Sequence, residues 1–166
     1  MFRPRTQSAP FINGNFISRN TEENASCSTG ENLRNALRNA ELIPKLDEPI
    51  GSNWVTIDDE FVVVYSGHQT HLSSDCFFAP QAKLDDGIIW LLFIRGDATR
   101  AQVLHFLTAL DAGSHINLPY VYLVPVHAFR LEPHSTDGRI TIDGELIDCG
   151  PIQAEVLPSI ARIMSR

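Results

Sequence analysis

The run "IIWLLFIR", residues 88–95, is the feature that most constrains the fold of this chain. It is apolar almost without interruption, which predicts a strand that is buried on both faces. The run is far too short to span a bilayer. Strand-like runs also precede and follow it, whereas no alternating βα rhythm is present. This pattern predicts a mainly β fold with one or two helices, arranged as an antiparallel β-sandwich.

The expected strands around this run are short and rich in β-branched residues. "WVTI" and "FVVVYSG" are read as two strands separated by the acidic "DDE", and "DCFFAP" as a third that stops at Pro80. "YVYLVPVHAFRL" is expected to be a long strand that Pro125 interrupts, which places it at a sheet edge or a bulge.

One helix is well marked, from Ala98 to Ala112. Asp97 is its predicted N-cap, and Gly113 is the predicted stop. His115 follows at once, where a cation would interact favourably with the helix dipole. Two interpretations remain open for the apolar face of the helix: packing on the sheet, or lining a pocket for an apolar ligand. That face consists of Val103, Phe106, Leu107 and Leu110.

The segment "GRITIDGELIDCG" predicts a β-hairpin. Asp143-Gly144 is a strong signal for a two-residue type I′ loop, which makes Ile142 and Glu145 opposed neighbours. Glu145 therefore ends a face that is otherwise aliphatic. It is either a carboxylate at the rim of the sheet that the turn keeps exposed to solvent, or a carboxylate held at the mouth of a cleft.

Composition limits the classes of function. The 166 residues, 43% of them hydrophobic, allow one domain with a real core. A formal net charge of −7, without a basic stripe, argues against a nucleic-acid partner. The three cysteines, Cys27, Cys76 and Cys149, form no CxxC pair and suit reduced thiols in a cytosolic protein.

Residues 1–46 differ from the rest and are expected to be largely disordered, because they are polar with few clustered hydrophobic residues. A short, marginal helix is possible in "ENLRNALRNAEL". The beginning of the chain shows no signal peptide. "RTQSAP" has the form that 14-3-3 proteins bind once Ser8 is phosphorylated, although such short matches are common by chance.

Other motifs give little evidence for a nucleotide-binding, hydrolytic or metal site. Neither a GxxxxGK[ST] nor a GxGxxG phosphate loop is present, and no GxSxG elbow. His68 and His71 form an HxxH pair, but two residues are not a site, so no metal site is predicted. Asp85-Asp86-Gly87 is better explained as a turn before a buried strand than as a Mg²⁺ ligand set.

Five segments of the chain match segments of a known protein family in the same order. They are "NWVTIDDEFVVVYSGHQTHLSSDCFFAP", "DDGIIWLLFIRG", "TRAQVLHFLTALDAGSHI", "HAFRLEP" and "TIDGEL". Together they resemble the C-terminal part of the sphingosine kinases, within the diacylglycerol-kinase-like lipid kinases. The similarity runs without large gaps from about Leu46 to Leu157. "AFRLEP" followed by "IDGEL" is its most specific part.

The resemblance implies a two-lobe enzyme that converts sphingosine and ATP to sphingosine 1-phosphate and ADP. In that family an N-terminal α/β lobe binds ATP, and a C-terminal β-sandwich lobe holds the lipid. The SGDG-type loop, the catalytic aspartate and the opening strands of the second lobe have no counterpart here. Residues 47–160 are thus expected to be a truncated C-terminal lobe with a tail at 161–166. By itself it would hold no catalytic residue and have no kinase activity.

The resemblance also assigns site residues by position. Asp143, Gly144 and Glu145 match the family's DGE motif, which approaches the nucleotide phosphates and Mg²⁺ of the full-length enzyme. The helix matches the segment that gates and lines the sphingosine pocket. The implied lipid-binding positions are Leu92, Val103, Phe106, Leu107, Leu110 and His115.

Implied partners are a sphingoid-base lipid, the N-terminal kinase lobe and a membrane touched transiently from a cytoplasmic location. Two other readings stay open. One is a non-catalytic β-sandwich module that binds a lipid or a protein. The other is a fragment that does not fold stably alone and exposes strand edges.

Overall fold

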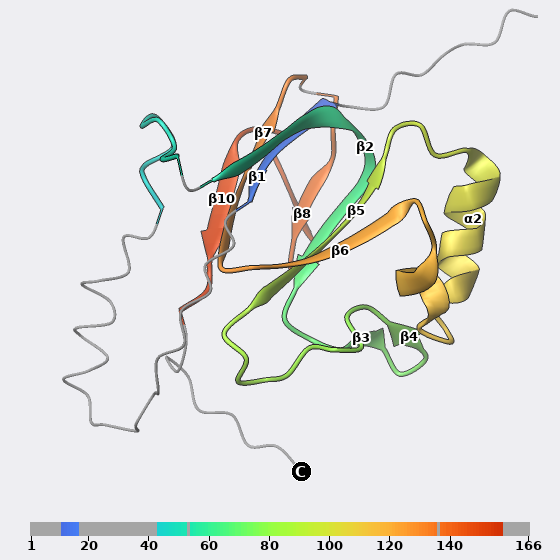
Figure 1. The fold of residues 1–166 in the computed structure, drawn as a ribbon. Helices are drawn as coiled ribbons and strands as arrows, with labels where there is room; N and C mark the ends of the chain where they lie inside the picture. The colour runs from blue at the N-terminus through green and yellow to red at the C-terminus, as the bar shows by residue number, and fades with distance from the viewer. Residues whose placement is uncertain (1–10, 17–42, 53, 136, 158–166) are drawn as a thin grey trace, which may run out of the picture.

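The computed structural model describes residues 11–16, 43–52, 54–135 and 137–157 (Figure 1). These residues are mainly β, with one α-helix and a 3₁₀ turn. In chain order the elements are β1 Phe11–Phe16, β2 Val55–Gly67, β3 His71–Ser73, β4 Cys76–Phe77, β5 Ile89–Arg95, α2 Arg100–Ala109, η1 Ser114–Asn117, β6 Val121–Val126, β7 Ala128–Pro133, β8 Ile140–Ile142, β9 Glu145–Ile147 and β10 Ile152–Glu155.

The main sheet has six strands in the order β10-β7-β1-β2-β5-β6, and every pairing in it is antiparallel. Strand β2 changes partner along its length. Val55–Glu60 pair with β1, whereas Phe61–Gly67 pair with β5, and the register shifts between Phe61 and Val63. A bulge of this kind bends a strand. The sheet accordingly turns a corner at β2, and its two halves form the layers of the predicted sandwich (Figure 1).

The core has two layers, one on each face of β5. Ile89, Leu91 and Phe93 pack against β7 and β10 inside the sandwich, in one buried cluster. The alternate residues of β5 pack against α2 in a second cluster, which contains Phe78, Ala79, Ala82, Trp90, Leu92, Ile94, Phe106, Leu110 and Val121. The predicted burial of this strand on both faces is therefore confirmed.

A buried cation ties the segment before β2 to the sandwich. Arg130 of β7 is only 2% exposed. Its guanidinium donates to the carbonyls of Pro44, Lys45 and Glu48 at 2.8, 2.8 and 3.0 Å. Its Nε donates to Oε1 of Gln153 on β10 at 3.1 Å. One side chain thus satisfies several acceptors of a segment more than 80 residues away in sequence.

Several predicted boundaries were wrong. The acidic "DDE" does not separate two strands, because it lies inside β2, where its residues pair with β1. The break in the long C-terminal strand falls at His127 rather than at Pro125. Pro125 lies inside β6, which is an edge strand as predicted, so its missing N–H interrupts no ladder on the outer side.

Strand β1 was not predicted at all. Phe11–Phe16 were expected to be disordered, yet their backbone pairs with both β2 and β7 in the middle of the sheet. Both partners lie far away in sequence, so no local pattern announces the pairing. The rest of residues 1–46 before Ile43, including the possible helix, Cys27 and Ser8, lies outside the described residues, as do residues 161–166.

The helix begins later than predicted. Its N-cap is Thr99 rather than Asp97, and Thr99 forms a capping box with Gln102. It ends at Ala109, with Leu110 as C-cap. Gly113 adopts a left-handed φ of 65° at the start of η1, not at the helix stop. None of the described helices is long and apolar enough to cross a membrane.

Candidate functional site

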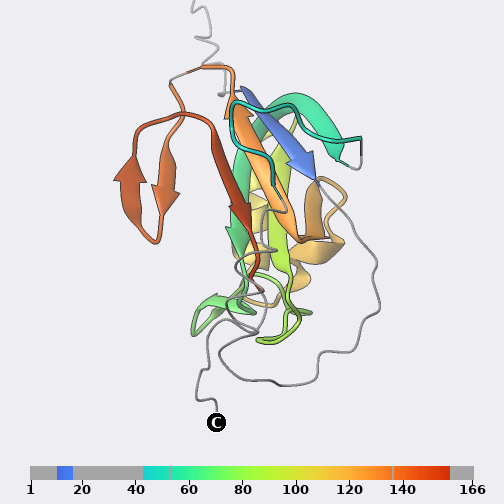
Figure 2. The ribbon, with the colours of Figure 1, turned by 90° about the vertical axis from the view of Figure 1, so that its left-hand side faces the viewer.

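The β8–β9 hairpin has the predicted geometry but not the predicted burial. Asp143 and Gly144 both have positive φ, 50° and 88°, as a type I′ loop requires, and Ile142 lies opposite Glu145. Ile140 and Ile147 are half-buried, whereas Ile142 is 52% exposed and Glu145 is exposed. Figure 2 shows the hairpin standing away from the body of the protein. Glu145 is therefore exposed to solvent at the tip of a projecting hairpin.

The other candidate residues lie between β5 and α2. Leu92, Phe106 and Leu110 are buried in one cluster, and Val103 is half-buried. Leu107 is 55% exposed, so its placement on the buried face was wrong. Ala109 is buried on that face instead, because residues 103, 106, 109 and 110 share one side of the helix. Side chains fill the layer between β5 and α2. The apolar face of the helix therefore packs on the sheet, which is the first of the two interpretations left open by the sequence.

His115 is the polar member of this layer. It is fully buried, and its Nε2 lies 2.8 Å from the carbonyl oxygen of Phe78. A carbonyl only accepts, so Nε2 donates to it. Nδ1 has no hydrogen-bond partner among the described residues. The ring packs edge-on against Phe106, with centroids 5.9 Å apart. His115 thus places one ring nitrogen without a hydrogen-bond partner among the described residues in an apolar layer.

The structure does not join the two groups of candidate residues. The hairpin contributes no member to the cluster between β5 and α2. Figures 1 and 2 both show it apart from α2. Any chemistry that uses both groups therefore needs a further element to bring their ligands together.

The remaining motifs are explained by local structure. Asp86 accepts from the backbone N–H groups of Lys83 and Ile88 and from Nε1 of Trp90, which confirms the turn reading. Nδ1 of His68 donates to the carbonyl of Ile88, and His71 pairs with Thr70. Within the described part of the chain, no group of three or more His, Cys, Asp or Glu residues could hold a metal ion.

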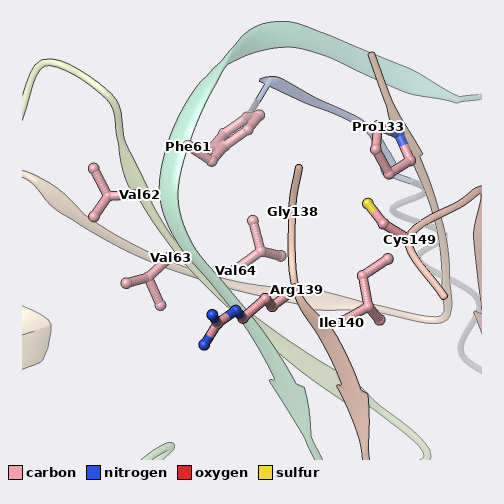
Figure 3. Close-up of a pocket in the computed structure, with 9 residues that line it drawn as sticks. All are labelled: Phe61, Val62, Val63, Val64, Pro133, Gly138, Arg139, Ile140 and Cys149. Carbon is pink, nitrogen blue, oxygen red and sulfur yellow. The ribbon is translucent and has the colours of Figure 1, made fainter. Parts of the chain in front are cut away.

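A hollow of about 340 Å³ lies between β2 and the start of β8, and sequence reasoning missed it (Figure 3). Its lining is mainly apolar, with Arg139 as its cation. The residues are Phe61, Val62, Val63, Val64, Pro133, Gly138, Arg139, Ile140 and Cys149. The only sequence signal for it is the run of valines, which also reads as an ordinary strand.

Truncating a side chain on the buried face of α2 should lower the free energy of unfolding more than truncating one on the exposed face. Phe106→Ala is expected to lower the free energy of unfolding by about 3–5 kcal/mol, because it removes a buried ring. Leu107→Ala should change it by less than about 0.5 kcal/mol, because that side chain is more than half exposed. Urea unfolding of the two variants checks this, and equal losses would contradict the orientation of the helix.

Comparison with known proteins identifies the family. Residues 55–165 match the family model described as the YegS C-terminal NAD kinase beta sandwich-like domain. The match covers more than half of the chain and agrees with the observed antiparallel β architecture. The chain therefore belongs to this family of β-sandwich lobes, which is part of the diacylglycerol-kinase-like lipid kinases.

Several curated relatives of the chain are named sphingosine kinases. Human sphingosine kinase 2 is 36% identical over 126 residues, which are 75% of this chain and 19% of that protein. Mouse sphingosine kinase 1 is 40% identical over 121 residues, 71% of this chain and 31% of that protein. Human sphingosine kinase 1 is 38% identical over 123 residues, 72% of this chain and 32% of that protein. The chain thus spans about a fifth to a third of the length of these relatives.

Proposed function

We propose that this chain is the lipid-binding lobe of a sphingosine kinase and that it requires a nucleotide-binding lobe to act. The observation that carries the proposal is the similarity of about three quarters of the chain to sphingosine kinases at 36–40% identity. Those relatives are named for activity toward sphingosine, and ATP is the usual phosphoryl donor of a kinase.

The layer between β5 and α2 is the proposed lipid site. Its walls are Leu92, Val103, Phe106 and Leu110, and His115 supplies a buried polar atom, Nδ1. Burying each methylene of a single-chain lipid contributes roughly 0.8 kcal/mol. Because this layer is packed, α2 must move away from β5 to admit the hydrocarbon chain of a sphingoid base. Leu107, on the outer side of α2, would reach the lipid only in that displaced position.

The hairpin tip is the proposed contact with the nucleotide. Asp143 and Glu145 are exposed around Gly144, where no atom lies within 4 Å of an added Cβ, so another lobe has room to approach. These two carboxylates do not by themselves fit ATP and Mg²⁺, since the sequence lacks a phosphate loop and the described residues form no larger ligand cluster. The remaining ligands and the base that accepts the substrate proton are assigned to the other lobe.

The proposed reaction moves the γ-phosphoryl group of ATP to the primary hydroxyl of the sphingoid base. A new O–P bond forms while the bond between the γ-phosphorus and the bridging oxygen breaks, and ADP leaves. Catalysis of this kind depends mainly on positioning and on charge stabilisation. In this proposal the chain positions the lipid and presents the Asp143-Gly144-Glu145 turn, and transient membrane contact from the cytoplasm supplies the lipid. Binding of a 14-3-3 protein at phosphorylated Ser8 is a separate, minor part of the proposal.

A kinase assay tests the proposed function. The purified chain, given sphingosine and radiolabelled ATP, is expected to release no sphingosine 1-phosphate, because it brings no phosphate loop. Adding the part of mouse sphingosine kinase 1 that this chain does not match should restore turnover. Turnover by the chain alone would overturn the need for a second lobe.

A lipid titration separates the alternative. Binding of sphingosine without any restored turnover would favour a non-catalytic lipid-binding module. If the chain neither binds sphingosine nor restores turnover, the assignment as a lipid lobe is wrong.

A further inference from the structure

Helix α2 is tied to the strands by backbone hydrogen bonds just before its start and just after its end. Before the helix, the N–H of Gly96 donates to the carbonyl of Glu60 on β2 at 2.7 Å. After it, the carbonyl of Leu110 accepts from the N–H of Phe77 on β4 at 2.9 Å. A movement of α2 away from β5 that keeps both bonds is therefore a rotation about the line that joins these two points.

Between these two points, one side chain from outside the helix holds α2. Tyr120 belongs to the segment between η1 and β6, which lies beside α2 (Figure 1). Its hydroxyl donates to the carbonyl oxygen of Gln102 in the first turn at 3.0 Å, and Nδ1 of His105 lies 3.2 Å from the hydroxyl oxygen. Among the residues that the structure describes, no other group outside residues 96–114 hydrogen-bonds to residues 98–109.

Tyr120 is fixed to the sheet rather than to the helix. The next residue, Val121, begins β6 and pairs with Ile94 of β5. The ring of Tyr120 is half-buried and packs against the cluster between β5 and α2. Its hydroxyl therefore links the first turn of α2 to the sheet that forms the opposite wall of this layer.

The hydrogen bond from Tyr120 and the apolar contacts of α2 respond differently when a lipid enters. Phe106 and Leu110 exchange contacts with β5 for contacts with the hydrocarbon chain, so their apolar surface stays out of water. The hydrogen bond has no such replacement, because a hydrocarbon neither donates nor accepts. Breaking this bond therefore adds to the free energy that opening the layer requires.

We propose that Tyr120 holds α2 closed over β5 and that its hydroxyl thereby lowers the affinity of the layer for the hydrocarbon chain of a sphingoid base. The role in lipid binding rests on the proposed function, whereas the closure of α2 does not. A ligand that binds only the open form has its apparent affinity reduced by the fraction of molecules that are open. Removing the hydroxyl raises that fraction, so the chain should bind the lipid more tightly. Truncating a residue that only supported the shape of the site would weaken binding instead.

The first test compares sphingosine binding by the full chain and by its Tyr120→Phe variant, which loses the hydroxyl and keeps the ring. The dissociation constant for sphingosine should fall by roughly two- to ten-fold, which is the effect of one ordinary hydrogen bond on an equilibrium. Tryptophan fluorescence can follow the titration, because Trp90 belongs to the layer.

Tyr122→Phe is the matched control. It makes the same chemical change close by in β6, but the ring of Tyr122 stacks on Phe93 inside the sandwich rather than facing α2. The hydroxyl of Tyr122 makes no hydrogen bond within the described part of the chain. This variant should bind sphingosine like the unmodified chain.

A measurement without lipid tests the closure of α2 by itself. Leu92 on β5 is 1% exposed in the layer beneath α2, so a cysteine at this position reacts with a thiol reagent only when the layer opens. Leu92→Cys is combined with Tyr120→Phe or with Tyr122→Phe, and peptide mass spectrometry separates its labelling from that of the native cysteines. Labelling should quicken by the same factor by which sphingosine binding tightens, and only in the Tyr120→Phe chain.

Two outcomes would overturn the proposal. One is weaker or unchanged binding of sphingosine by Tyr120→Phe when the unmodified chain binds it. The other is labelling at position 92 that Tyr120→Phe does not quicken, or that Tyr122→Phe quickens equally. Faster labelling in Tyr120→Phe, when no form of the chain binds sphingosine, would confirm the closure of α2 and contradict the proposed function, so the two failures are distinguishable.

Discussion

Arg130→Ala is expected to lower the free energy of unfolding by about 3–5 kcal/mol, the largest loss from any single polar side chain among the described residues. The substitution leaves the carbonyls of Pro44, Lys45 and Glu48 without their donor, and it removes the partner of Gln153. A single hydrogen bond from a charged donor contributes about 1.5–3 kcal/mol, and bonds made by one side chain do not add fully. The ion pair with Glu132, at 3.7 Å and half exposed on the acid side, adds little.

Urea unfolding measures this loss, and two variants locate it. Arg130→Lys keeps the charge but cannot span several carbonyls with one ammonium group, so it should lose about half as much. Gln153→Ala should lose about 1.5 kcal/mol, because only one hydrogen bond from the charged donor is removed. Hydrogen exchange in residues 44–48 should quicken in Arg130→Ala. An unchanged exchange rate there would show that Arg130 does not hold this segment.

Glu145→Ala is expected to reduce turnover by about 100-fold when the chain is complemented with a nucleotide lobe. The proposed function places this carboxylate beside the phosphates and their metal ion, where charge must be balanced as the phosphoryl group moves. Because Glu145 is exposed, the same substitution should leave the free energy of unfolding within about 0.5 kcal/mol of the unmodified chain.

Asp148→Ala is the matched control for this experiment. It removes the same charge from the same hairpin, three residues away and on an exposed position that is not part of the turn. Turnover should stay within about two-fold of the unmodified chain, since a distant surface charge is largely screened. If both variants lose activity equally, the effect is one of net charge, and Glu145 has no particular role at the phosphate site.

The parts of the fold that follow a local pattern could be predicted. The apolar run of β5 is buried on both faces as expected, and the Asp143-Gly144 loop has the positive φ values of its turn type. These features depend on neighbours within a few residues. The helix face was only partly predicted, because Leu107 fits an apolar spacing equally well on either side of the buried stripe.

Pairings between distant segments could not be predicted. The sequence alone determined a mainly β sandwich, the tight hairpin with its carboxylate, and the resemblance to sphingosine kinases. Only the tertiary structure decided that Phe11–Phe16 form a central strand and that Arg130 binds carbonyls more than 80 residues away. It also decided that β2 changes partner beside a hollow. Strand partners and buried acceptors are set by the packing of the whole chain, and a local sequence pattern carries no record of them.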